Sequence, residues 1–391
     1  MRVDSEITTP ASSFHLHTSL PLPSKLRQID GLQVLRAIAV TLVAWGHSNQ
    51  QVYSLGVVAP HFGIFGIDIF FVISGFIMSS IVIHTQTSSG ATTAWSFFQR
   101  RIVRIYPIYW IIASLAIVRA LHAHQPVLRF IPAFFLLPLP QCPLIYGLSW
   151  TLMFEMFFYT VMATLLLVTV RRSVHLAAAI FCISAIIGAI VGIHRPLWII
   201  VCNPILLEFV FGAVIALAYR RFGTSRSVGI TLLVLGVALS FYLRAYPPAS
   251  ATSMQMILAG QSILYRVATW GMTAALIVAG TVFWTPSITS RLGKIAVVVG
   301  NASYSAYLAS PLVEEFTIRL ILKIRPATHI SFVAGIYYIC ILVLATLGMG
   351  WLCYQFVEWP LVRSIQSKLK TSHKSSARQK IAPTPLVNTK P

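Results

Sequence analysis

The chain has 391 residues, of which 57% are apolar and only 10% are charged, and its mean hydropathy is +0.79. A soluble core of this size does not require so many apolar residues, so the composition indicates a polytopic membrane protein. The net charge of +20 could suit a nucleic-acid partner, but a basic soluble domain would also carry many acids. We therefore expect the lipid bilayer as a partner and no nucleic acid.

In chain order, residues 1–30 are rich in Ser, Thr and Pro and are expected to form a disordered cytoplasmic lead. Residues 31–360 are expected to form the transmembrane domain, and the basic residues 361–391 a disordered cytoplasmic tail that can contact anionic lipid. Ten segments approach the ~20 residues that cross a bilayer. These segments are 32–53, 62–84, 105–121, 147–170, 175–193, 197–219, 228–243, 261–284, 295–313 and 329–357.

The distribution of positive charge orients these segments. With the N-terminus inside, 21 of the 29 Lys and Arg residues fall on the cytoplasmic side, and Arg266 falls within a span. This bias favours an all-α membrane helix bundle of about ten transmembrane helices with both termini in the cytoplasm. The segment 122–146 contains five prolines and is predicted to be an outer or re-entrant piece rather than a full crossing.

Two polar side chains lie within the otherwise apolar first span. Arg36 and His47 are eleven residues apart, which returns them to nearly the same helical face, about 16 Å apart along the axis. A buried Arg or His is costly in lipid without a partner, so each marks a candidate functional site. Alternatively, Arg36 reaches the lipid headgroups and His47 bonds to a neighbouring helix.

Acidic residues are few, so those within spans carry information. Asp68, Glu155 and Glu208 lie in the second, fourth and sixth predicted spans, where an unpaired carboxylate is expensive. Each is a candidate site residue, although a structural hydrogen bond between helices explains any one of them equally well. The five cysteines are scattered, so the sequence implies neither a disulfide framework nor a metal site.

An arginine cluster stands at the start of the third span. Arg101 and Arg104 are three residues apart, with Arg100 beside them, so on a helix they form a fork-shaped receptor for an anion such as a phosphate. The spacing alone fits ordinary topology anchors as well. An anion receptor on the cytoplasmic side, together with a buried histidine most of a membrane width away, favours a chemical role.

An ordered set of segments, from about residue 29 to 360, carries a resemblance to a known family. On this set the chain resembles the acyltransferase 3 family of membrane acyltransferases, and within it the exopolysaccharide O-acetyltransferase branch. No single segment is decisive, but the order of the set is specific. The segments are LRAIAVTLVAWGH, GIDIFFVISGF, FFQRRIVRIYPIYW, LSWTLMFEMFFY, NPILLEFVFGAVIA, GNASYSAYLASP and VEWP.

The resemblance implies a ten-helix enzyme of the bacterial inner membrane. Such an enzyme moves an acetyl group from cytosolic acetyl-CoA to a hydroxyl of a carbohydrate on the outer side. The resemblance also implies that His47 is the catalytic residue and that Arg101 and Arg104 bind the coenzyme. One departure is Ser310, which stands where the family commonly has a histidine, so the role of that histidine is not transferred.

A thioester is already activated, so the reaction needs no metal, only a base and donors for the tetrahedral oxyanion. We expect His47 to be the general base and Asp68 to orient it, with Glu155 as a further catalytic candidate. The pantetheine arm is expected to follow the line from the coenzyme's phosphates to His47, and an acyl-enzyme on His47 stays open. The expected coenzyme contacts are Arg36, Arg101 and Arg104.

Other interpretations remain open. Another acyl group such as succinyl, or a lipid or small-molecule acceptor, would suit the same residues. A secondary transporter or flippase would also carry intramembrane Arg, His and carboxylates, and it predicts an alternating-access pathway without turnover of acetyl-CoA. A structural or receptor-like membrane protein would need no buried charge.

Overall fold

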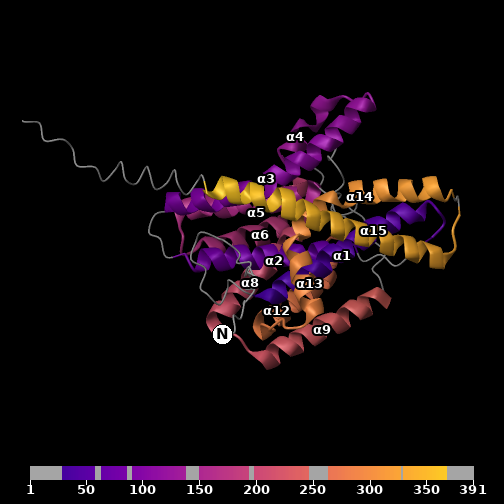
Figure 1. The fold of residues 1–391 in the computed structure, drawn as a ribbon. Coiled ribbons are helices and arrows are strands. Elements are labelled where there is room, and N and C mark those ends of the chain that lie inside the picture. Colours follow the sequence, from indigo (N-terminus) through magenta and orange to yellow (C-terminus); the bar gives the residue numbers. More distant parts are fainter. Residues whose placement is uncertain are drawn as a thin grey trace, which may run out of the picture.

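The chain forms a bundle of α-helices in a computed structural model (Figure 1), which describes residues 29–57, 63–85, 90–137, 149–192, 198–245, 263–326 and 329–367. No β-strand occurs within these ranges, which confirms the predicted all-α class. The predicted lead and most of the predicted tail lie outside them. The elements are α1 (Asp30–Tyr53), α2 (Gly63–Ile83), α3 (Gly90–His122), η1 (Val127–Phe130), α4 (Ile131–Phe134), α5 (Ser149–Val168), α6 (Ser173–Val191), α7 (Trp198–Val201), η2 (Pro204–Leu206), α8 (Leu207–Phe222), α9 (Arg226–Ala245), α11 (Ile263–Arg266), η3 (Val267–Gly271), α12 (Met272–Trp284), α13 (Arg291–Asn301), α14 (Ser303–Ile324), α15 (Phe332–Cys353) and η4 (Tyr354–Glu358).

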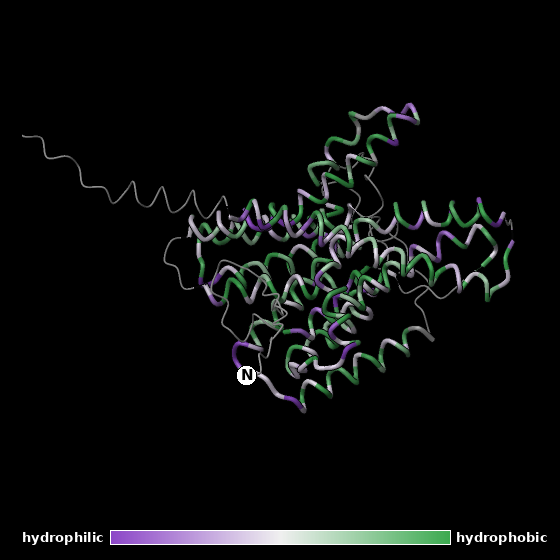
Figure 2. Tube along the Cα trace, viewed as in Figure 1, coloured by the Kyte–Doolittle hydropathy of each residue, from purple (hydrophilic) through white to green (hydrophobic). Residues whose placement is uncertain are grey.

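Eight helices of the described chain are long and apolar enough to cross a membrane, and they coincide with eight of the ten predicted spans. Helix α9 lies at the edge of the bundle and is hydrophobic along most of its length (Figure 2). Helices α6 and α9 leave much of their apolar surface uncovered by protein, as lipid contact requires. The chain is therefore a multi-pass membrane protein. The total of ten crossings and the cytoplasmic position of both termini stay predictions.

The helices of the two predicted spans outside this set, 32–53 and 295–313, each carry several buried polar side chains. Helix α1 lies against α2, α13, α14 and α15, and α14 lies against α1 and α15, so protein rather than lipid covers many of these polar groups. The polar residues of both helices thus lie on the side that faces the protein interior. Their buried polar or charged residues are Gln33, Ser48 and Asn49 on α1 and Ser303, Ser305, Ser310 and Glu314 on α14.

The predicted span 295–313 is divided into two helices at Ala302. Helix α13 runs across the direction of α1 and α15 (Figure 1), and α14 then follows the bundle. Close packing sets the position of α13, because a Cβ atom on Gly300 would lie 1.9 Å from the Gln33 carbonyl oxygen of α1. Helix α13 therefore passes α1 at backbone contact and leads α14 toward the interior.

The structure bears on two further predictions, the start of the third span and the segment that follows it. Helix α3 begins at Gly90, well before the predicted residue 105, so the arginine cluster lies within the helix and not at its start. The proline-rich segment 122–146 is described only to residue 137, where it forms the short helices η1 and α4 rather than a crossing. Residues 138–148, which include Cys142, lie outside the described residues.

Helix α2 packs at backbone distance against α8. A Cβ atom on Gly75 would lie 2.2 Å from the Phe209 carbonyl oxygen, and one on Gly212 would lie 2.2 Å from the Val72 carbonyl oxygen. Small residues permit this approach, which is typical of helix pairs in membranes. The contact holds α2 in the centre of the bundle, where one of its faces reaches the candidate site.

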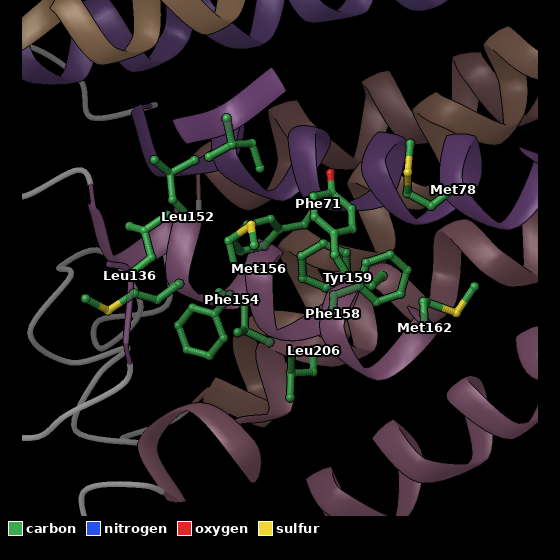
Figure 3. Packing of buried hydrophobic residues seen from close by; sticks show 14 of the residues in the cluster. Phe71, Met78, Leu136, Leu152, Phe154, Met156, Phe158, Tyr159, Met162 and Leu206 are labelled. Atoms are coloured by element: carbon green, nitrogen blue, oxygen red, sulfur yellow. The ribbon is translucent and has the colours of Figure 1, made fainter. Parts of the chain in front are cut away.

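An aromatic cluster fills the space between α2, α5 and α8 (Figure 3). The rings of Phe158 and Phe209 stack with centroids 4.6 Å apart, and Phe71 lies 4.7 Å from the same Phe209 ring. Tyr159 stands beside Phe158 in this cluster and turns its hydroxyl toward polar neighbours. The cluster therefore packs α5 against α2 and α8 beside the candidate site.

Replacing Gly212 by alanine is expected to lower the thermal unfolding midpoint, because the added methyl group meets the α2 backbone, which cannot move aside. Gly348 on α15 is the matched control, since a Cβ atom there meets nothing within 4 Å. Gly348→Ala should leave the midpoint unchanged or raise it, as expected for glycine to alanine in an open helix position. Equal midpoints for the two variants in lipid nanodiscs would contradict the close contact.

Candidate functional site

A cavity of about 720 Å³ lies between α1, α2, α3, α5, α14 and the extension of α15. Its described lining is unusually cationic for a membrane interior, with five guanidinium groups and two carboxylates. Four of these guanidinium groups are only partly exposed, and a surplus of positive charge that is partly withdrawn from water is costly unless an anion occupies the space. The charged lining residues are Arg36, Arg100, Arg101, Arg104, Arg363, Glu155 and Glu358.

The α3 arginines form the most cationic wall of this cavity. Arg104 lies 3.7 Å from Glu358, so its charge is partly compensated. The Arg101 guanidinium lies over the Tyr159 ring, 5.9 Å from its centroid. Arg100 Nη1 and Arg101 Nε are buried and have no hydrogen-bond acceptor among the described residues. Buried donors of this kind are normally satisfied, so they point to a ligand with acceptor oxygens.

Arg36 reaches the same cavity from α1. Its Nε donates a hydrogen bond to Ser303 Oγ at 3.1 Å, which joins the start of α14 to α1. The structure thus brings Arg36, Arg101 and Arg104 to one space, although they are separated by up to 68 positions in the sequence. Whether they bind a coenzyme stays a prediction.

Glu155 also lines the cavity and is held from two sides. Its carboxylate accepts a hydrogen bond from Ser74 Oγ on α2 at 3.0 Å and another from the Tyr159 hydroxyl one helical turn away. These bonds fix the carboxylate near the cationic wall. Glu155 therefore balances part of the charge of the α3 arginines.

Asp68 does not line the cavity. It is fully buried and forms an ion pair with Arg266, which lies 198 positions away, and the Glu208 carboxyl lies beside this pair. The geometry therefore gives Asp68 a cationic partner in the bundle interior, and it gives no support to the idea that Asp68 orients His47. The three groups join α2, α8 and α11.

Replacing Arg266 by glutamine is expected to destabilise the protein strongly, because two buried carboxyls would lose their cation. Breaking such a pair costs about 3–5 kcal/mol. The double variant Arg266→Gln, Asp68→Asn should recover part of the lost thermal midpoint. Arg319→Gln is the control, because the Arg319 side chain is 72% exposed in its bridge to Glu315 and should change the midpoint little.

His47 lies beyond the inner end of the cavity and does not line it. Val40 and Val43 share the helical face of Arg36 and His47 and stand between them. Both valines are buried in one core cluster with Ile67 and Tyr307. Arg36 and His47 therefore lie on one face of α1 as predicted, but the two buried valines separate them.

The inner end of the cavity carries a hydroxyl pair next to this wall. The Tyr307 hydroxyl and Thr151 Oγ1 lie 2.6 Å apart and join α14 to α5. Ser310, which stands where the resembled family commonly has histidine, is buried and donates to the Tyr307 carbonyl oxygen at 3.0 Å within its own helix. Ser310 is not among the cavity lining residues.

Glu314, which is not among the residues predicted for the site, is a buried carboxyl at the level of His47. The Arg36–Ser303 bond and the shared packing of Val52 with Ile318 show that α1 and α14 run side by side in the same direction. Eleven residues beyond Arg36 and Ser303 stand His47 and Glu314, so they lie at a similar depth.

The surroundings of Glu314 are polar. Its Oε1 accepts a hydrogen bond from Thr346 on α15 at 3.3 Å, and Ser48, the neighbour of His47, lies beside the same carboxyl. Its position near the end of a predicted span concealed it, because that span was expected to end at residue 313. Glu358 belongs to the VEWP segment that carries the resemblance but was given no role in the site, and it lies beside Arg104, where it also accepts a hydrogen bond from Ser305 at 2.6 Å.

The chain is similar to known proteins along most of its length. The family model of acyltransferase 3, described as an acyltransferase domain, matches residues 29–355. The chain is 26% identical over 329 residues to the exopolysaccharide production protein ExoZ of Rhizobium meliloti (strain 1021), which covers 79% of this chain and 93% of that protein.

A second relative is the protein named "Putative O-acetyltransferase SACOL0978" of Staphylococcus aureus (strain COL). It is 39% identical over 83 residues, which is 21% of this chain and only 13% of that protein. No solved structure gives a significant match. Because the family model covers most of the chain, including α1, α3 and α5 with their charged residues, the protein belongs to the acyltransferase 3 family and is a membrane acyltransferase.

Proposed function

We propose that the protein transfers an acetyl group from acetyl-CoA, bound from the cytoplasm, to a hydroxyl of a carbohydrate on the outer side of the bacterial inner membrane. The observation that carries this proposal is the cationic cavity, with buried guanidinium donors of Arg100 and Arg101 that have no protein acceptor in the described chain. The family supplies the reaction class, and the cavity supports an anionic acyl donor.

The donor fits the cavity in size and in polarity. A volume of about 720 Å³ lies within the usual range of pockets that bind small molecules and cofactors. The α3 arginines would bind the pyrophosphate, since guanidinium groups match phosphate oxygens in pairs. The inner part is lined by Ile67, Phe70 and Phe71, which suit the less polar pantetheine arm and the thioester.

His47 would act as the general base for the acceptor hydroxyl. The hydroxyl oxygen attacks the thioester carbonyl while its proton passes to the imidazole, and the C–S bond then breaks to release the thiolate of coenzyme A. The imidazolium returns its proton to this thiolate, which leaves as the thiol. The thioester has to pass Val40 and Val43 to meet His47, so this proposal requires those two side chains to move during transfer.

The acceptor class is inferred from a relative. ExoZ is named for exopolysaccharide production, and it aligns along nearly its whole length with this chain. An exopolysaccharide or lipid-linked glycan hydroxyl is therefore the proposed acceptor. The polar groups at the depth of His47, including Glu314 and Ser48, are consistent with a site that admits a polar acceptor from the outer side.

The test uses membranes from a bacterial host that makes an exopolysaccharide and expresses the full chain. Inverted vesicles receive acetyl-CoA labelled in its acetyl group, and the carbohydrate fraction is then analysed for alkali-labile label. The proposal predicts label above that of vesicles lacking the protein. Turnover of succinyl-CoA in place of acetyl-CoA would overturn the donor assignment, and label in lipid alone would overturn the acceptor assignment.

A further inference from the structure

The last helix continues past residue 357, where the predicted span ends, to Ser367. Segment η4 is a π-helical turn, in which an additional residue in the turn changes the direction of the side chains that follow. The helical residues at and beyond this turn extend one wall of the cavity. Those that line it, besides Glu358, include Gln355, Trp359, Val362, Arg363 and Gln366.

The spacing of these residues shows that they share one face. Gln355, Trp359, Val362 and Gln366 follow one another at intervals of four, three and four, which is the period of a helical stripe. Tryptophan and arginine at the end of a membrane span are ordinary interfacial anchors when they face lipid. Trp359 and Arg363 instead line the cavity, so anchoring does not account for their orientation.

The two residues also contact each other. The Arg363 guanidinium lies over the Trp359 ring, 5.0 Å from its centroid. Trp359 is half-buried and Arg363 is exposed, so the pair lies where the lining of the cavity reaches the protein surface. An aromatic plane and a cation are thus held together at the entrance, while the buried donors of Arg100 and Arg101 lie on another wall.

We propose that Trp359 and Arg363 form the subsite for the adenosine 3′-phosphate end of coenzyme A. The indole would stack on the adenine ring. Arg363 would bind the phosphate on the ribose 3′ oxygen, which is separate from the pyrophosphate of the donor. The amides of Gln355 and Gln366 on the same face can pair with the polar edge of adenine. This inference rests on the proposed function, because it assigns a further contact of the same donor.

The test measures equilibrium binding of three compounds to the full chain in lipid nanodiscs. Coenzyme A carries both the adenosine and its 3′-phosphate, 3′-dephospho-coenzyme A lacks only that phosphate, and 4′-phosphopantetheine lacks the whole nucleotide. Arg363→Gln should weaken coenzyme A binding about tenfold and leave the binding of the dephospho compound unchanged. Trp359→Leu should weaken the binding of coenzyme A and of 3′-dephospho-coenzyme A about tenfold and leave the binding of 4′-phosphopantetheine unchanged. Trp359→Phe should retain most of the affinity for the first two compounds.

Arg221→Gln is the matched control, because Arg221 also lies over an aromatic ring, that of Phe222 at 5.6 Å, but does not line the cavity. Equal weakening of all three compounds by Arg363→Gln, or no change with either variant, would overturn the subsite while wild-type binding upholds the proposed donor. If the folded wild-type protein binds none of the three compounds, the proposed function fails together with the subsite.

Discussion

Replacement of His47 by alanine is expected to reduce the rate of acetyl transfer by about 10²–10⁴-fold, the usual contribution of a positioned general base. Binding of coenzyme A should remain at the wild-type level, since His47 does not line the cavity that would hold the donor. The loss should therefore appear in kcat and not in the dissociation constant of the donor. The measurement combines initial rates with labelled acetyl-CoA and equilibrium binding of coenzyme A.

His84 provides a matched histidine control. Its Nδ1 lies 2.7 Å from the Ser80 carbonyl oxygen at the end of α2, away from the cavity lining. His84→Ala should keep the wild-type rate. A His47→Ala variant that transfers acetyl groups as fast as the wild type would remove the base role of His47 and leave the cavity as a binding site only.

Replacement of Arg101 by glutamine is expected to weaken coenzyme A binding by about tenfold to a hundredfold, because a charge-assisted hydrogen bond contributes about 1.5–3 kcal/mol. The variant lacks the buried Nε donor, so the proposed phosphate would lose that hydrogen bond, and the cationic wall would lose one charge. Arg101→Lys should recover only part of the affinity, because an ammonium group cannot make the paired contacts of a guanidinium.

Salt dependence gives a second readout of the same variant. The affinity of the wild type should fall as ionic strength rises, and the Arg101→Gln protein should show a shallower dependence. Arg226 serves as the control, since it is exposed at the start of α9 and does not line the cavity. Unchanged affinity in Arg101→Gln, with weaker binding in Arg226→Gln, would place the donor elsewhere.

Much of the helical architecture follows from local pattern. Apolar segments of sufficient length predict spans without any knowledge of neighbours, and eight of them are found in the structure. The bounds of α14 were harder to predict from the sequence, because Ser303, Ser310 and Glu314 lower its hydropathy. In addition, the break at Ala302 depends on the contact of α13 with α1. The break reflects tertiary packing, which a local pattern does not contain.

The candidate site was predictable where residues lie on one helix. Arg101 and Arg104 are neighbours by spacing, and both reach the cavity. The partner of Asp68 was not predictable, because Arg266 comes from a helix 198 positions away. Similarly, helical period places Arg36 and His47 on one face, but it does not reveal which side chains pack between them.

The proposed donor site is tested most directly by a structure determined with coenzyme A bound to the full chain in lipid nanodiscs. We predict phosphate oxygens within hydrogen-bond distance of Arg100 and Arg101, and a thiol end that passes Ile67 toward His47. Coenzyme A bound outside this cavity, or with its thiol directed away from His47, would contradict this prediction.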